Sequence, residues 1–176
     1  MRVLVPLVNG FEEIEAISAV DVLRRADFDV VTAGLPGTMV EGNRGVKVIA
    51  DMMLKDINPD DFDVLVLPGG SGCSDLVKSS KMMETIRHFS SKDKVIAAIC
   101  YAPVLLAREG LLKDKRATVY PGNERELPKP RGDRVVVDGN LITSQGPGTA
   151  IEFSLAIVEK LAGKPKADSL RKGIVA

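Results

Sequence analysis

The sequence predicts a doubly wound α/β sandwich with a mostly parallel central sheet. Short apolar runs alternate along the chain with amphipathic stretches, which is the order of strand–helix–strand units. The runs at 2–8, 63–67 and 94–99 are rich in Val, Ile and Leu, and such runs are typical of central parallel strands covered by helices on both faces. The third run ends at Cys100, and a helix pattern follows it. This cysteine therefore lies at a strand-to-helix turn.

The first half of the chain alternates as this architecture requires. Strands are predicted at 2–8, 28–33, 63–67 and 94–99, and helices at 11–26 and 81–89. In the first helix, apolar residues recur at helical spacing and predict one buried face made of Ile14, Ile17, Ala19, Val20 and Leu23.

The second half begins with the helix directly after Cys100. A short strand is expected near 117–119, then a hairpin of 134–137 and 141–143, and a last helix at 149–161. The hairpin is predicted because Asp138-Gly139-Asn140 separates two apolar runs and an Asp-Gly pair favours a tight turn. Residues 124–133 contain two prolines and a glycine and predict a flexible loop, and 163–176 are expected to form a terminal tail.

Composition limits the class of protein. A chain of 176 residues with 45% hydrophobic content predicts a single domain at 1–176, with its core at about 2–162. The formal net charge is zero, so neither a nucleic-acid partner nor a membrane surface is indicated. The first apolar run is too short for a signal peptide or a membrane span. Two cysteines suit a reducing cytosol, and we expect a cytoplasmic location.

Four segments are expected to meet at the carboxyl ends of the strands, where ligands bind in sheets of this kind. These segments are 9–15, 68–72, Cys100 and 144–148. Cys100 is the candidate nucleophile, because the turn needs small neighbours and Ala98 and Ala102 supply them. A thiol at a helix N-terminus also tends to ionise early, which predicts a lowered pKa for Cys100.

Gly69 and Gly70 follow the second central strand. Glycines there allow main-chain N–H groups to point at a developing oxyanion, and an ordinary turn at the end of a strand explains them equally well. The segment lacks the motifs of nucleotide-binding loops. No cofactor is therefore expected.

Glu12, Glu13 and Glu15 lie in the first turns of the first helix. Interaction with the helix dipole is sufficient reason for most glutamates at this position. Glu15 differs because it flanks the predicted apolar face. A carboxyl beside a thiol in a poorly hydrated cleft has a raised pKa, and it can donate a hydrogen bond to a thiolate or transfer a proton.

Five ordered motifs together resemble the ThiJ/PfpI superfamily, in the branch of the human parkinsonism-associated protein. They are Gly10-Phe11-Glu12-Glu13-Ile14-Glu15, Asp21-Val22-Leu23-Arg24-Arg25-Ala26, Leu67-Pro68-Gly69-Gly70, Ala97-Ala98-Ile99-Cys100 and Thr143-Ser144-Gln145-Gly146-Pro147-Gly148-Thr149. The resemblance extends from about Val3 to Leu161 and implies a flavodoxin-like sandwich and a homodimer.

The resemblance also implies roles for individual residues. Cys100 matches the family nucleophile at the elbow, and Glu15 matches the protonated glutamate beside it. Gly70 and the amide of Tyr101 match the main-chain oxyanion donors. Arg44 resembles an arginine that lies near the dimer interface and the site.

Two positions depart from the family pattern. Protease-like members have a histidine directly after the cysteine, and this chain has Tyr101, so peptidase activity is not expected. In the human-like branch a site histidine precedes a proline after the elbow helix, and Tyr120 occupies that place. The single histidine, His88, lies in the helix before the elbow strand and has no neighbours at metal-ligand spacing. No metal site is predicted.

Among the activities that the resemblance implies, these residues best fit a cofactor-independent glyoxalase or deglycase that acts on 2-oxoaldehydes such as methylglyoxal, or on their protein adducts. The absence of a site histidine predicts slow turnover. The alternative is a redox sensor of the stress response, because an accessible thiolate oxidises to sulfinate and a protonated Glu15 would stabilise that state. A holdase chaperone is a third possibility, and it would need an exposed apolar patch. Cys73 is either a packed core residue or a resolving thiol for Cys100.

Overall fold

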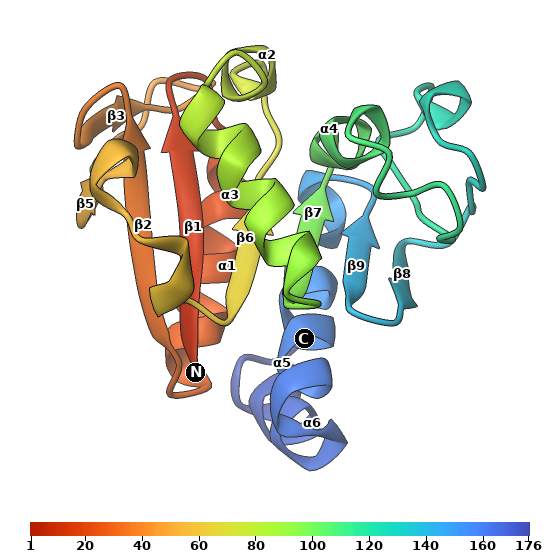
Figure 1. Cartoon of the computed structure of the whole chain (residues 1–176). Helices are drawn as coiled ribbons and strands as arrows, with labels where there is room; N and C mark the ends of the chain where they lie inside the picture. Colours follow the sequence, from red (N-terminus) through yellow and green to blue (C-terminus); the bar gives the residue numbers. More distant parts are fainter.

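A computed structural model describes residues 1–176 and contains a seven-stranded sheet between two layers of helices (Figure 1). The strand order is β5-β2-β1-β6-β7-β9-β8. All neighbouring strands are parallel except β8 and β9, which form the predicted antiparallel hairpin. A separate two-stranded ribbon, β3 and β4, lies next to β1 and β2. The predicted doubly wound α/β architecture is confirmed.

The strands are β1 (Arg2–Val8), β2 (Asp29–Leu35), β3 (Met39–Glu41), β4 (Lys47–Ile49), β5 (Met52–Met53), β6 (Val64–Leu67), β7 (Val95–Ile99), β8 (Val135–Asp138) and β9 (Leu141–Ser144). The α-helices are α1 (Glu13–Arg25), α2 (Cys73–Leu76), α3 (Ser80–Ser91), α4 (Ala102–Arg108), α5 (Ala150–Ala162) and α6 (Lys164–Gly173). Single 3₁₀ turns lie at Leu54–Asp56, Pro59–Asp61, Glu124–Glu126 and Pro147–Thr149. No helix is long and apolar enough to cross a bilayer.

The sheet separates two apolar cores, because successive strand side chains point to opposite faces. One core packs β1, β6 and β7 against α2, α3 and α4, and its residues include Leu4, Leu65 and Ala98. The other packs the same strands against α1, α5 and α6, and its residues include Val3, Val64 and Ala97. Consecutive strand residues thus serve different cores, which accounts for the continuous apolar runs.

The buried face of α1 differs from the prediction. Ile14 and Ile17 are 55% and 43% exposed, and the helix instead buries Glu13, Glu15, Ala16, Ala19, Val22 and Leu23. A helix repeats every 3.6 residues, so a face that contains Ala16, Ala19 and Leu23 turns Ile14 and Ile17 outward. One consequence is that Glu15 lies inside the protein, where the sequence had suggested only the flank of the apolar face.

Two further segments correct the sequence interpretation. Residues 117–119 form no regular strand, because only Ala117 makes an isolated bridge, to Pro130. The expected tail after Gly163 is helical: α6 packs on α5 and buries Ala167 against the second core. Gly163 has a φ of 85°, a conformation that suits glycine, and this turn reverses the chain between the two helices.

Candidate active site

The turn from β7 into α4 holds Cys100 in a constrained backbone conformation. Its φ is 64°, in the left-handed region that L-residues other than Asn and Asp rarely enter. Two main-chain hydrogen bonds hold it there: Cys100 donates to the Ser144 carbonyl at 2.9 Å, and Tyr120 donates to the Cys100 carbonyl at 2.9 Å. Ala98 and Ala102 are fully buried on either side. The fold thus forms the strand-to-helix elbow at Cys100 that the sequence indicates.

Glu15 is a fully buried carboxyl beside this thiol. Its Oε2 accepts a hydrogen bond from the Gly69 N–H at 2.7 Å, whereas its Oε1 is buried without a hydrogen-bond partner. Burial raises the pKa of Glu15 to about 7, against the lowering effect of the Gly69 amide, and the nearby Glu12 adds to the rise. The carboxyl is therefore poised to gain or lose a proton near neutral pH.

The pKa of Cys100 differs from the expectation. Burial and the Glu15 carboxylate together raise the pKa of the Cys100 thiol to about 12, and the main-chain amides of Tyr101 and Gly70 only partly oppose this rise. Two negative charges this close in a poorly hydrated site are unfavourable. Near pH 7 the sulfur therefore keeps its proton while Glu15 titrates, and the Glu15 carboxylate is the base available to the thiol.

The glycine loop after β6 approaches the thiol closely. A Cβ at Gly69 would lie 2.6 Å from the Cys100 Cβ and 3.0 Å from its Sγ, so only glycine leaves room for the thiol. Gly70 has a φ of 107°, and a Cβ there would collide with the Gly10 carbonyl oxygen. The amides of Gly70 and Tyr101 both stabilise the thiolate of Cys100. They form a pair of donors suited to an oxyanion on an adduct of this sulfur.

The two other side chains that the sequence analysis singled out, Tyr120 and Arg44, differ in how they are connected to the Cys100 elbow. Tyr120 is joined to the elbow through its main chain, and its side chain is 47% exposed. Arg44 is exposed on the turn between β3 and β4, where its main-chain N–H donates to the Glu13 Oε1 at 2.5 Å. The structure brings Arg44 to the same end of the sheet. It does not bring Arg44 into the thiol site of this chain.

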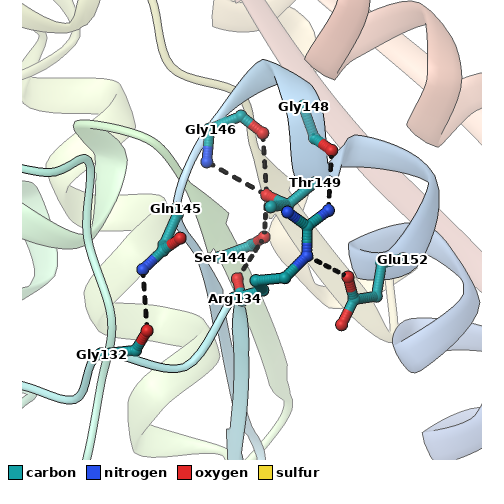
Figure 2. A network of polar contacts seen from close by, with 8 residues as sticks. All are labelled: Gly132, Arg134, Ser144, Gln145, Gly146, Gly148, Thr149 and Glu152. Carbon is teal, nitrogen blue, oxygen red and sulfur yellow. Dashed lines mark hydrogen bonds and ion pairs between the residues drawn. The ribbon is translucent and has the colours of Figure 1, made fainter.

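A buried hydroxyl network next to the elbow was not singled out from the sequence (Figure 2). Thr149 Oγ1 lies 2.6 Å from Ser144 Oγ, donates to the Gly146 carbonyl at 2.8 Å and accepts from the Gly146 N–H at 3.1 Å. Ser144 Oγ donates to the Arg134 carbonyl at 3.0 Å. Because the Ser144 carbonyl accepts the Cys100 N–H, this network fixes the position of the elbow. The motif at 143–149 is the only signal for it in the sequence.

His88 lies apart from the site, whereas Cys73 lies behind the glycine loop, where its Sγ donates to the Pro68 carbonyl at 3.7 Å. Cys73 is 1% exposed in the core on the α3 side, whereas Cys100 packs against the core on the α1 side. His88 lies 3.0 Å from Asp60, which precedes β6 and so lies at the opposite end of that strand from Gly69. The structure therefore gives no support to Cys73 as a resolving thiol.

Thiol labelling under native conditions is expected to modify one cysteine. Cys100 is partly accessible, whereas Cys73 is only 1% exposed. Mass spectrometry after iodoacetamide treatment at pH 8 should show one adduct, on Cys100, and a second only after denaturation. The variant Cys73→Ala serves as the control and should label as the wild type does. Faster labelling of Cys73 than of Cys100 would contradict this description of the site.

No group of three or more His, Cys, Asp and Glu side chains is placed to bind a metal ion. The polar groups around Cys100 are the Glu15 carboxyl and main-chain amides. This is a donor set for protons and oxyanions.

Fold and site together define an α/β sandwich with a cysteine on a strand-to-helix elbow and a buried glutamate beside it. The family model described as DJ-1/PfpI family matches residues 1–160. The chain belongs to the DJ-1/PfpI family, and the flavodoxin-like fold expected from the sequence is confirmed.

Several relatives match nearly the whole chain. Protein dj-1beta of Drosophila melanogaster is 46% identical, over 98% of this chain and 95% of that protein. Its crystal structure superposes with a TM-score of 0.94 at 44% identity and covers 99% of this chain and 97% of that one. Protein DJ-1 homolog B of Arabidopsis thaliana is 43% identical over 97% of this chain, which spans 40% of that longer protein. A Caenorhabditis elegans relative named glutathione-independent glyoxalase DJR-1.2 is 37% identical, over 92% of this chain and 88% of that protein.

Proposed function

We propose that this protein is a cysteine-dependent, cofactor-independent enzyme that converts small 2-oxoaldehydes such as methylglyoxal to 2-hydroxy acids. The observation that carries the proposal is the buried Glu15 carboxyl, with a pKa of about 7, beside the Cys100 thiol and with its Oε1 free of hydrogen-bond partners. The glyoxalase name of the C. elegans relative supports the same reaction class.

The first step is addition of the thiol to the aldehyde. The Glu15 carboxylate accepts the thiol proton while the Cys100 sulfur bonds to the aldehyde carbon, which gives a hemithioacetal. The amides of Gly70 and Tyr101 donate to the oxygen that gains charge. Once Glu15 is protonated, its repulsion of the sulfur is removed, which favours this step.

The second stage is a rearrangement that needs no oxidant. Protonated Glu15 first gives the thiol proton to the hemithioacetal oxyanion and becomes a carboxylate again. This carboxylate removes the hydrogen from the former aldehyde carbon as a proton, which gives an enediolate, and returns it to the neighbouring carbon. The proton of the hemithioacetal hydroxyl moves to the former ketone oxygen. The product is a 2-hydroxyacyl thioester on Cys100. Water then cleaves the thioester, releases the hydroxy acid and restores the thiol. In total one molecule of water is added to the 2-oxoaldehyde, and Glu15 is the only side chain that carries protons in the scheme.

The fate of hydrogen tests this mechanism. In D₂O, transfer through Glu15 is expected to place deuterium on C2 of the lactate formed from methylglyoxal, because a carboxyl exchanges its proton with solvent. Direct hydride migration would retain protium at C2. The ¹H NMR spectrum of the product distinguishes the two, and lactate with full protium at C2 would rule out Glu15 as the carrier. Lactate incubated with the protein in D₂O is the control for later exchange.

The same chemistry extends to glyoxal adducts of protein amines, in which the carbon attacked by Cys100 bears nitrogen. Both free aldehydes and such glycated proteins are therefore proposed as substrates. The reaction needs a reduced Cys100, which agrees with residence in a reducing cytosol.

A redox sensor is the second candidate, favoured by the same pair of amides. Hydrogen peroxide would oxidise the thiolate of Cys100 through sulfenate to sulfinate, and Gly70, Tyr101 and a protonated Glu15 would donate hydrogen bonds to the sulfinate oxygens. A sensor undergoes one oxidation for each Cys100 and forms no lactate. Product counted per mole of protein separates this candidate from the enzyme.

A homodimer is proposed on the basis of apolar side chains that the chain leaves exposed. Ile14, Ile17 and Val46 are 55%, 43% and 50% exposed, and they lie near one another because the Glu13 Oε1 on α1 accepts the Val46 N–H at 3.4 Å. Clustered exposed apolar residues of this kind mark interaction surfaces.

Charge introduced on this surface is expected to separate the protomers. In sedimentation equilibrium the wild type should have the mass of two chains and Ile17→Lys the mass of one, because a buried ammonium at an apolar interface is unfavourable. Val137→Lys, at an exposed residue on β8, is the matched control and should stay dimeric. A wild-type monomer, or a dimeric Ile17→Lys variant, would contradict the assignment of this surface.

A further inference from the structure

An open groove lies next to the segments that hold the main chain of the elbow. It has a volume of about 200 Å³, and its walls include Tyr120, Pro121, Gly146 and Pro147. Both walls are joined directly to the elbow, because the Tyr120 N–H donates to the Cys100 carbonyl and the Cys100 N–H donates to Ser144, at the start of the second wall. The groove therefore lies beside the backbone that holds the Cys100 thiol.

The Tyr120 ring lies beside a glycine in this groove. A Cβ at Gly146 would lie 3.1 Å from the ring Cδ2 and 3.5 Å from Cε2, so a larger residue at 146 would crowd the ring. Tyr120 is nevertheless 47% exposed, which leaves ring surface free.

Two polar side chains of the groove make hydrogen bonds within the protein (Figure 2). The Arg134 guanidinium binds Glu152 at 2.8 Å and the Gly148 carbonyl at 2.9 Å. The Gln145 amide donates to the Gly132 carbonyl at 3.0 Å. The rest of the lining includes the Tyr120 ring, two proline rings and glycine backbone. An aromatic ring and proline rings favour a flat group, and the Arg134 charge is already paired with Glu152.

We propose that Tyr120 is a specificity-determining residue, which directs the enzyme toward 2-oxoaldehydes that carry an aromatic substituent. The inference rests on the proposed function and names its substrate class: the reactive aldehyde lies at Cys100, and the aromatic group packs on the Tyr120 ring. Methylglyoxal reacts at the same thiol and leaves the groove empty.

The test compares two substrates in three proteins. The ratio of kcat/KM for phenylglyoxal to that for methylglyoxal is expected to fall about 10-fold in Tyr120→Ala, because stacking and burial of one aromatic ring contribute about 1–2 kcal/mol. The ratio should be retained in Tyr120→Phe, which keeps the ring. A ratio unchanged in Tyr120→Ala, or a fall of equal size in Tyr120→Phe, would overturn the assignment.

A binding measurement separates this inference from the proposed function. Acetophenone, which carries the ring and a ketone and has no aldehyde, is expected to slow the alkylation of Cys100 by iodoacetamide in the wild type and in Tyr120→Phe. It should protect Tyr120→Ala several-fold less. If both aldehydes go unconverted while this protection holds, the glyoxalase proposal fails and the aromatic groove stands. Equal protection of all three proteins overturns the groove assignment.

Discussion

Replacement of Cys100 by serine is expected to lower the rate of lactate formation from methylglyoxal by at least about 10³-fold. A serine hydroxyl has nearly the same size, so the two main-chain hydrogen bonds that hold the elbow remain. The hydroxyl is far harder to deprotonate, and Glu15 with a pKa of about 7 is too weak a base to activate it.

The second cysteine provides the matched control for this prediction. Cys73→Ser changes the same atoms in the core on the opposite face of the sheet, and its turnover per folded protein should stay within about twofold of the wild type. Thermal unfolding of both variants establishes the folded fraction. Equal rates for Cys100→Ser and wild type would remove the thiol from the mechanism.

Replacement of Glu15 by glutamine is expected to stabilise the fold above neutral pH and to abolish most turnover. The pKa of Glu15 is raised from 4.5 to about 7 in the folded protein, so the native state retains a proton that the unfolded chain releases. Glu15 therefore favours folding fully below about pH 4.5, and this contribution is lost as the pH rises to about 7. The change is about 3 kcal/mol, and above pH 7 the wild type has the full cost of the buried charge.

Glutamine keeps the acceptor for the Gly69 N–H and cannot ionise. The free energy of unfolding of Glu15→Gln should therefore exceed that of the wild type by up to about 3 kcal/mol at pH 8, and the difference should shrink toward pH 5. Urea denaturation at several pH values measures it. Asp21→Asn, on the exposed face of the same helix, is the control and should show a much smaller dependence. A variant that is less stable than the wild type at pH 8 would contradict a buried, charged Glu15.

The same substitution should reduce turnover by about 10²–10⁴-fold, the usual contribution of one positioned proton carrier. In the wild type, kcat/KM should rise as the pH increases through about 7, because the carboxylate form of Glu15 accepts the thiol proton. In Glu15→Gln this inflection should disappear. The combination of higher stability and lower activity distinguishes a functional carboxyl from a structural one.

The elements that could be predicted from the sequence were those whose pattern is dictated by burial on two faces. The strands β1, β6 and β7 are apolar throughout because their alternate residues fill separate cores. The hairpin of β8 and β9 could be predicted from local sequence, because the backbone conformation of a tight turn favours an Asp-Gly pair. The sequence also predicted that the glycine loop and the elbow lie close together, because the carboxyl ends of parallel strands share one edge of the sheet.

Other features depend on contacts that the sequence does not reveal. The outward rotation of Ile14 and Ile17 is set by how α1 packs on β1 and α5, and apolar side chains on both sides of a helix leave that choice open. The helix α6 has few apolar residues, and its position depends on the turn at Gly163. Its sequence alone resembled a tail.

The pKa of Cys100 is the most instructive difference. The helix terminus predicted a lowered pKa from one local effect. Burial of the thiol and the charge of Glu15 act in the other direction and are larger. Both depend on the depth of the site, which follows from the packing of α1 and α4 on the sheet. The position of Glu15 beside the thiol could be inferred from the sequence, but its complete burial could not.

The measurement that tests the central proposal most directly is the yield of lactate per mole of freshly reduced, metal-free protein supplied with excess methylglyoxal. The wild type should form many equivalents at pH 7.5, whereas Cys100→Ser and Glu15→Gln, both folded, should form few. Lactate that never exceeds one equivalent, or that forms equally fast with Cys100→Ser, would contradict a thiol–carboxyl enzyme, and the peroxide oxidation of Cys100 would then become the function to examine.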